Sequence, residues 1–286
     1  MDELTSRTVW PVIPFQYGIQ ADIRIAANLL VRSAAFSTLD YAGGAVRPEI
    51  KEPLSLTTIA PYGLEQVAGV RLSQSDADLF YWLLSRAYGR GAPKGDAWVY
   101  FKRAEALAAL SRVRGGKTDS LLEDSLMRLY QADFAYKLPG TAGRSRLVSC
   151  IERFDAGEKP YDYKVAVSDG VAALLDGGEW LALRGKERDQ LAGDPLAKGL
   201  HAFYASHLSA FPMLPSTLKA LMGRESMQDS KWRNALDKAL EKVKEATGWF
   251  QCEMAKAGPY KGKVVVVKGR RVRKVPKESG PTTAEI

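Results

Sequence analysis

Residues 98–131 read WVYFKRAEALAALSRVRGGKTDSLLEDSLMRLYQ, and this stretch decides the predicted fold. Trp98–Phe101 has the aromatic and β-branched composition of a strand, and Arg103–Leu110 has the apolar spacing of a short helix. The turn at 111–116 contains two glycines and leads into a longer helical pattern over Lys117–Gln131. Two helices joined by a short turn with glycine predict a helix-turn-helix.

The neighbouring segments extend this pattern into a winged helix. Five apolar residues form the predicted inward stripe of the longer helix: Leu121, Leu122, Leu126, Leu129 and Tyr130. Upstream, Leu54–Leu72 reads as two short strands, and Ser75–Asp78 is expected to cap a helix. Downstream, Phe134–Leu138 and Arg146–Arg153 read as strands on either side of a turn at 139–143. This hairpin is the predicted wing.

The same order of elements recurs in the second half of the chain. A long helix is predicted over Glu187–Leu208, and a short one over Ser216–Met222, where proline and glycine stand at the expected start and stop. The next helix is expected to open at Ser226–Asp229 and to run to about Ala246. Its inward stripe is Trp232, Leu236, Leu240 and Val243. Trp249–Met254 and Lys263–Val267 then supply another hairpin.

We therefore predict an α+β protein made of two tandem winged-helix domains, each with a helix-turn-helix and a β-hairpin wing. Residues 1–53, with a helix near Ala21–Phe36, are interpreted as an N-terminal extension. The domains are placed at 54–167 and 168–267. Residues 268–286 are expected to form a basic, disordered tail, because they hold too little apolar surface to offset the entropy of ordering.

The positive charge of the chain is concentrated near its end. The sequence has 41 Lys and Arg against 33 Asp and Glu, a net charge of +8. Lys261–Lys277 holds eight basic residues and no acid, so 33 basic residues face 33 acidic ones elsewhere. Net charge alone therefore argues only weakly for a nucleic-acid partner, and the placement of individual cations has to carry the case.

The composition, 46% hydrophobic and 26% charged, is typical of a packed globular protein. Met1–Trp10 has no secretory pattern, and no stretch approaches the roughly 18 to 20 apolar residues that cross a bilayer. Cys150 and Cys252 form no CxxC pair. We therefore expect a cytoplasmic protein in a reducing compartment.

No catalytic, cofactor or metal site is expected. Arg114–Thr118 is similar to the end of a P-loop, but Ser111 stands where the first glycine is required, and a helix rather than a strand leads in. His201 and His207 lie six residues apart, so they do not share a helix face as metal ligands would. The sequence therefore predicts a binding protein and not an enzyme.

The predicted DNA contacts follow from the helix-turn-helix, in which the turn and the start of the second helix reach base edges in the major groove. In the first domain these are Arg112, Arg114, Lys117 and Ser120. In the second domain they are Gln228, Ser230, Lys231, Arg233, Asn234 and Lys238. The hairpins are expected to contact phosphates or the minor groove through Arg144, Arg146, Lys256, Lys261 and Lys263. Ordinary solvated faces are the alternative, and the grouping at two corresponding places favours DNA.

Six stretches of the chain resemble the TrfA-type replication initiators of broad-host-range plasmids, in the same order and spacing. They are Arg32–Phe36, Leu72–Leu79, Ile151–Phe154, Phe203–His207, Leu221–Gly223 and Lys231–Arg233. The resemblance implies a protein that binds directly repeated double-stranded sites, called iterons, at a plasmid origin. It also implies opening of adjacent AT-rich DNA, contact with single-stranded origin DNA, recruitment of host DnaA and replicative helicase, and copy-number control through monomers and dimers.

Two qualifications bound this resemblance. The family's Gln-Leu-Ser-Leu-Phe motif for the host sliding clamp has no match upstream of Arg32, so clamp binding lies outside what the resemblance implies. The rival interpretation is a winged-helix transcriptional repressor, which would share the fold and lack a replication role. Such repressors usually carry one reading unit per chain, so two units favour repeated sites that a monomer spans.

Overall fold

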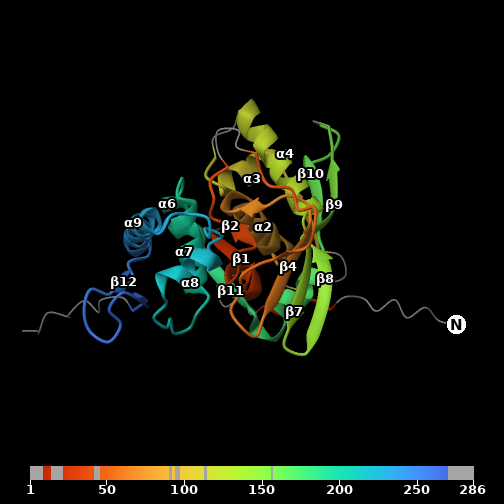
Figure 1. Ribbon diagram of the computed structural model, residues 1–286. Helices are drawn as coiled ribbons and strands as arrows, with labels where there is room; N and C mark the ends of the chain where they lie inside the picture. Colours follow the sequence, from red (N-terminus) through yellow and green to blue (C-terminus); the bar gives the residue numbers. More distant parts are fainter. Residues whose placement is uncertain are drawn as a thin grey trace, which may run out of the picture.

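The computed structural model describes residues 9–13, 22–41, 46–89, 92–93, 97–112, 115–155 and 157–269. The buried side chains form two hydrophobic cores, which define two units. The core of the first unit takes its residues from Trp10 to Leu183, with Ala202, and that of the second unit from Leu191 to Val266. Figure 1 shows the two units side by side. In the part of the chain described, no helix is long and apolar enough to span a membrane.

Helix α2 (Gln74–Ala87) runs through the middle of the first unit. Its cap is Ser73 rather than the predicted Ser75. The Ser73 hydroxyl accepts the backbone N–H of Asp76, and the Asp76 carboxylate accepts the backbone N–H of Ser73 at 2.9 Å, which forms a capping box. Side chains on several faces of α2 are buried, including Leu79, Phe80 and Trp82. A helix covered on all sides marks the centre of a core.

The arrangement of elements at the predicted helix-turn-helix is a strand followed by two helices. It comprises β6 (Ala97–Phe101), α3 (Arg103–Ala109) and α4 (Gly116–Gln131). Two further strands, β9 (Val148–Arg153) and β10 (Tyr163–Val167), join β6 in an antiparallel sheet of order β6-β10-β9. The hairpin that follows α4 in this sheet is therefore β9–β10, and the loop between its strands is 154–162.

The predicted inward stripe of α4 is correct except at one position. Leu122, Leu126 and Leu129 are buried and Tyr130 is partly buried, but Leu121 is 43% exposed. Successive residues of a helix are about 100° apart, so Leu121 lies farther than Tyr130 from the direction shared by Leu122, Leu126 and Leu129. The spacing of Leu122, Leu126 and Leu129 decides which leucine faces inward.

The predicted strand over Arg146–Arg153 is present as β9, but the prediction that it forms the wing hairpin with Phe134–Leu138 is wrong. A second sheet has the order β3-β4-β7-β8, formed by β3 (Leu54–Ser55), β4 (Gly63–Ala68), β7 (Asp133–Leu138) and β8 (Thr141–Arg146). Only Pro139 and Gly140 turn the chain between β7 and β8, and Gly140 has φ +82°. The chain therefore resumes as a strand at Thr141, ends it at Arg146, and starts β9 after the buried Leu147.

The N-terminal residues belong to the first core rather than to an extension. Strand β1 (Ile23–Ala27) pairs antiparallel with β11 (Trp180–Arg184), and α1 (Asn28–Val31) is fully buried. Strand β2 (Phe36–Ser37) pairs in parallel with β5 (Leu72–Ser73). The predicted helix over Ala21–Phe36 is therefore wrong in most of its length. A short apolar run covered on both faces shows no periodicity that separates helix from strand.

The second unit repeats the order of the first. After α5 (Gly170–Leu175) and η2 (Asp176–Gly178), its elements are α6 (Gly185–Gln190), α7 (Pro195–Ala205), α8 (Pro215–Leu221), α9 (Asp229–Thr247), β12 (Gln251–Met254) and β13 (Val264–Val267). Strand β12 pairs with β13, and Met213 bridges to Val264 on the other side of β13. This arrangement of Met213, β13 and β12 corresponds to β6-β10-β9 of the first unit.

The single long helix predicted over Glu187–Leu208 is wrong, because the chain breaks it into α6 and α7. Gly193 has φ +78°, a left-handed conformation that ends a helix readily. The Asp194 side chain accepts the backbone N–H of Ala197 at 3.0 Å and so caps α7. Pro195 then occupies the first turn, where its missing N–H costs nothing.

Candidate nucleic-acid interface

The start of α9 presents most of the residues predicted to read DNA in the second unit. Trp232 is 2% exposed, and its indole N–H donates to the backbone oxygen of Pro215 at 2.9 Å, which fixes the rotation of the helix. The helix therefore turns its predicted contact residues to solvent. All six are exposed: Gln228, Ser230, Lys231, Arg233, Asn234 and Lys238.

The cations of this face are available to a ligand. Lys231, Arg233 and Lys238 make no ion pair with any carboxylate of the described residues. The acid at the start of the helix is neutralised, because Lys219 contacts Asp229 at 2.7 Å and its hydrogen bond lowers the pKa of that carboxyl. The α9 face therefore offers positive charge and two amides, Gln228 and Asn234, the chemistry that suits phosphates and purine edges.

The hairpin β12–β13 adds cations beside α9. Lys256 and Lys261 are exposed and Lys263 is partly buried, and the connecting loop is closed by the Gly262 backbone N–H donating to Ala255 at 2.8 Å. Between this hairpin and α9 lies a cleft of about 650 Å³. Asp237 and Glu241 line this cleft on the helix side. An anion would therefore bind at the hairpin lysines and the start of α9 rather than inside the cleft.

The first unit places fewer cations at the corresponding positions. Arg112 is partly buried in the turn before α4, and Ser120 is exposed on the helix. Arg114 and the side chain of Lys117 lie outside the described residues. These four predicted contacts are thus only partly brought together by the structure.

Arg144 and Arg146 lie on β8, an edge strand of the four-stranded sheet, and not on the hairpin that pairs with β6. Arg144 pairs with Asp133 through two hydrogen bonds of 2.9 and 3.0 Å, and the hydrogen bond raises the pKa of its guanidinium. Arg146 lies 5.1 Å from the ring of Tyr130. Both arginines are exposed, but each already has a partner within the protein.

Cations close to α4 are used internally, which sequence reasoning missed. The Arg103 guanidinium contacts Asp119 at 3.2 Å and Glu123 at 2.9 Å, and a hydrogen bond from the same group to the Tyr163 hydroxyl raises the Arg103 pKa. Arg153 contacts Glu123 at 3.1 Å. These ion pairs neutralise positive charge that would otherwise be available to bind DNA phosphates.

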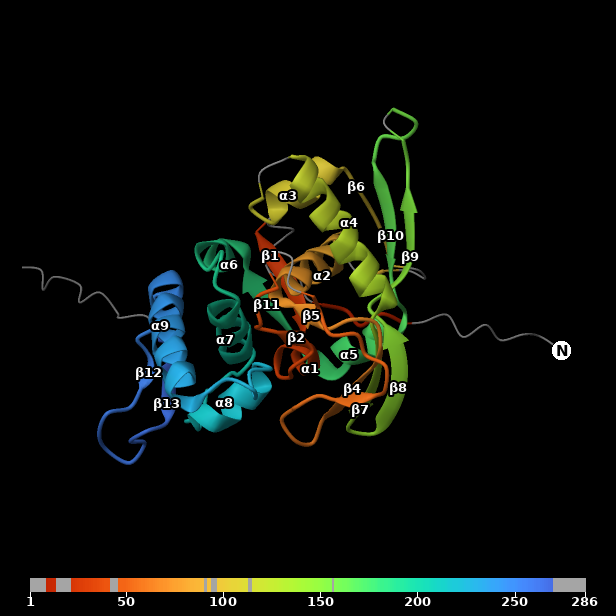
Figure 2. The same ribbon diagram turned by 45° about the horizontal axis from the view of Figure 1, so that its top comes forward.

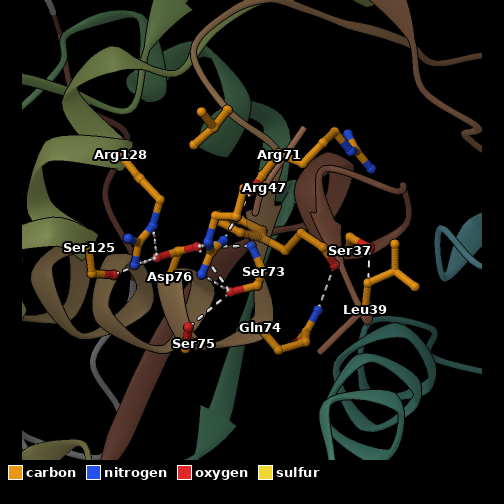
Figure 3. Close-up of polar contacts among 12 residues, drawn as sticks. Ser37, Leu39, Arg47, Arg71, Ser73, Gln74, Ser75, Asp76, Ser125 and Arg128 are labelled. Atoms are coloured by element: carbon orange, nitrogen blue, oxygen red, sulfur yellow. Dashed lines mark hydrogen bonds and ion pairs between the residues drawn. The ribbon is translucent and has the colours of Figure 1, made fainter. Parts of the chain in front are cut away.

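A buried carboxylate fixes α2 to its surroundings (Figure 3). Asp76 is fully buried, between Arg128 and Ser125 of α4 on one side and Arg47 and Ser73 on the other. Both arginines contact it at 2.8 Å, and the Ser125 hydroxyl donates to it at 2.6 Å. Burial alone would raise the pKa of this carboxyl, but Arg128 and Arg47 hold it below its usual value. The only sequence signal was the Ser73-x-x-Asp76 spacing of a capping box.

Two residues further on, Asp78 joins the two units. Its carboxylate accepts from Arg188 of α6 and from Lys198 of α7, each at 2.6 Å. Arg32 also crosses the junction: its guanidinium donates to the Ser206 hydroxyl at 2.9 Å and to the Ser206 backbone oxygen. The units are therefore held by buried charged groups as well as by apolar packing. Charges this far apart in sequence could not be paired from the sequence alone.

Comparisons with known proteins agree with this architecture. The crystal structure of domains 2 and 3 of RctB superposes with a TM-score of 0.50 and 17% identity, covering 79% of this chain and 91% of that one. A second crystal structure of RctB domains 2–3 gives a TM-score of 0.48 at 15% identity, with 82% and 95% coverage. The first match shows a shared mixed helix and strand fold of two domains.

Sequence comparison is more specific. The profile described as TrfA protein matches residues 49–254, more than half of the chain. The plasmid replication initiator protein TrfA of Escherichia coli is 24% identical over 179 residues, which is 62% of this chain and 46% of that relative. The match thus spans about half the length of the curated relative. The chain belongs to the TrfA family, as its resemblance in six stretches predicted.

Proposed function

We propose that this protein initiates plasmid replication by binding directly repeated double-stranded sites at an origin. One observation carries the proposal: the start of α9 exposes Lys231, Arg233 and Lys238 with no acidic partner among the described residues. Membership of the TrfA family supports the same function, because its Escherichia coli relative bears the name of a plasmid replication initiator.

The order of elements supports the interpretation of both units as winged helices. In the first unit, β10 lies between β9 and the upstream strand β6. In the second unit, β13 lies in the same way between β12 and the upstream residue Met213. In such a unit the second helix of the pair enters the major groove and the hairpin flanks it. We assign α9 to the groove and the β12–β13 lysines to the adjacent phosphates.

The further steps of the proposal are opening of AT-rich DNA and recruitment of host DnaA and helicase. They rest on the resemblance to TrfA-type initiators alone, since the name of the Escherichia coli relative says only that it is a plasmid replication initiator. We also propose that the chain acts by binding and not by catalysis, because Gly116–Thr118, the P-loop-like residues, begin α4 after helix α3 rather than after a strand. Release of phosphate from ATP by the purified protein would contradict this part.

Footprinting of the purified protein on the origin region of its own plasmid tests the central claim. We expect protection of several direct repeats of one sequence, with protection of each repeat by one chain. Protection of a single inverted repeat by two chains would instead indicate a transcriptional repressor of the same fold. Equal affinity for the origin and for random duplex at matched salt would reject sequence-specific binding altogether.

A further inference from the structure

Large apolar side chains are exposed around the end of β13, away from the proposed DNA contacts of α9. We call these residues the β13-end surface: Leu208, Phe211, Phe250 and Val267, which are 105%, 50%, 55% and 42% exposed. The pairing of Met213 with Val264 brings Phe211 alongside β13, and the pairing of Gln251 with Val267 brings Phe250 to the same end. Grouped exposed apolar side chains mark interaction sites more often than single ones do.

A cavity of about 240 Å³ adjoins this surface at the junction of the two units. Trp249, Ala205 and Thr247 line it on the side of the second unit, and Leu183 of β11 lines it on the side of the first. Lys268 lines the cavity and directly follows Val267 of the surface. Its ammonium group donates to the backbone oxygens of Ala205, at 3.1 Å, and of His207, and it lies 5.9 Å from the Trp249 ring. The surface and the cavity are therefore continuous.

The cavity wall contains a buried polar group that is not fully satisfied. His201 is 1% exposed, and its Nε2 lies 3.1 Å from the Glu187 carboxylate. Its Nδ1 has no hydrogen-bond partner within the described part of the chain. Buried polar atoms are nearly always paired, so His201 is an exception in the wall of this cavity.

The charge around the cavity is positive. The Arg184 side chain is 59% exposed at the rim, and Lys268 contacts no carboxylate of the described residues. Glu187 is already engaged by Arg184 and His201. A ligand for this region would therefore be acidic as well as apolar.

We propose that the β13-end surface docks an acidic segment of a partner protein, anchored by a large apolar side chain that packs on Leu208, Phe211 and Phe250 beside the cavity. Carboxylates that flank the anchor would face Arg184 and Lys268. The exposed Leu208 and Phe211 favour a protein over nucleic acid, because phosphates gain nothing from covering apolar side chains. The proposal does not rest on DNA binding.

The test uses the full chain and a fluorescent twelve-residue peptide in which Asp and Glu flank Leu and Phe. Two control peptides carry Lys in place of the acids, or Ser in place of Leu and Phe. We expect anisotropy to report binding of the first peptide, and binding of each control at least about tenfold weaker. Failure of the first peptide to bind, or equal binding of the Lys peptide, would overturn the proposal.

Variants of exposed residues locate the site without disturbing the cores. The double variant Leu208→Ser with Phe250→Ser should weaken peptide binding at least about tenfold and leave duplex binding unchanged. Leu121→Ser changes an exposed leucine of α4 outside this surface, so it is the control and should bind the peptide normally. Unchanged peptide binding by the double variant would overturn the proposal. Loss of a dimer by that variant in sedimentation would assign the surface to a second copy instead.

Discussion

The two units share an order of elements and differ in charge at the places where a winged helix meets DNA. The loop of the β9–β10 hairpin, residues 154–162, contains three acids and one lysine, whereas residues 255–263 between β12 and β13 contain three lysines and no acid. The second helices differ in the same sense. Acids on α4 engage Arg103 and Arg153, whereas the cations at the start of α9 are unpaired among the described residues.

Because their charges differ, two units with the same order of elements need not bind DNA equally well. Phosphates would be repelled by the first hairpin and attracted by the second, so we expect most of the DNA affinity to come from the second unit. Figure 2 shows α9 and the β9–β10 hairpin on opposite sides of the molecule, so they cannot contact the same few base pairs. The first unit would then position the second through Asp78 and Arg32.

The largest expected effect is a loss of stability confined to the second unit. Trp232→Ala removes a buried indole and its hydrogen bond to Pro215, so it should lower the free energy of unfolding by about 3 to 5 kcal/mol. DNA binding should be lost with the fold, as measured by thermal unfolding and by a binding titration on one sample. If the variant keeps its melting temperature but loses DNA, Trp232 faces the ligand and the helix register is wrong.

The next effect tests the first unit. Asp76→Asn leaves Arg47 and Arg128 facing a neutral amide in a buried site, so we expect a loss of about 3 kcal/mol in unfolding free energy at neutral pH. Because the folded-state pKa of Asp76 is lowered, its contribution is present above the unfolded pKa of about 3.9 and disappears as pH falls through the folded pKa.

Melting temperatures between pH 7 and pH 2 measure this contribution. The difference between the native protein and Asp76→Asn should be constant down to about pH 5 and should shrink below about pH 4. Glu65→Gln, a change of an exposed carboxylate on β4, is the control and should follow the native curve. A gap of the same size at pH 2 and pH 7 would show that packing, and not charge, makes Asp76 necessary.

A smaller effect is expected on DNA affinity, and it compares substitutions in the two units directly. Lys231→Ala and Arg233→Ala should each cost about 1 to 3 kcal/mol of binding free energy if they contact bases, with relaxed specificity. If they contact phosphates, all sequences should weaken and the salt slope should fall by about one unit. Arg112→Ala in the first unit is the counterpart and should cost less. Equal losses at Arg112 and Arg233 would mean that both units read DNA in the same way.

The sequence predicts well what local pattern controls. The helical spacing places α9 and the burial of Trp232 correctly, because one apolar stripe at helical spacing, followed by Gly248, specifies a helix. The pattern could not show that β1 pairs with β11, since residues far apart in the chain meet there. It also misjudged where the hairpin after α4 lies, because β7 and β8 are inserted before β9.

In the candidate site, too, the sequence predicts what local geometry controls and misses what tertiary contacts control. Exposure of the α9 residues follows from helix geometry alone, so their predicted orientation is confirmed, while their contact with DNA stays a prediction. The pairing of Arg103 with Glu123, or of Arg144 with Asp133, depends on tertiary contacts that no spacing indicates. Residues that resemble the TrfA family, such as Arg32 and Asp78, lie at the junction of the units. Another resembling stretch, Lys231–Arg233, lies at the start of α9, so the resemblance covers both the junction and the proposed DNA face.

The smallest effect concerns Arg144 and sharpens the comparison of the hairpins. Because Asp133 already engages its guanidinium through two hydrogen bonds, Arg144→Ala should change DNA affinity by less than about threefold. Asp133→Asn should release the arginine, so this variant should bind DNA slightly more tightly and with a steeper salt dependence if β8 lies near phosphates. Titrations at several salt concentrations measure both variants. A large loss of affinity in Arg144→Ala would place β8 at the DNA and restore a binding role to the first unit.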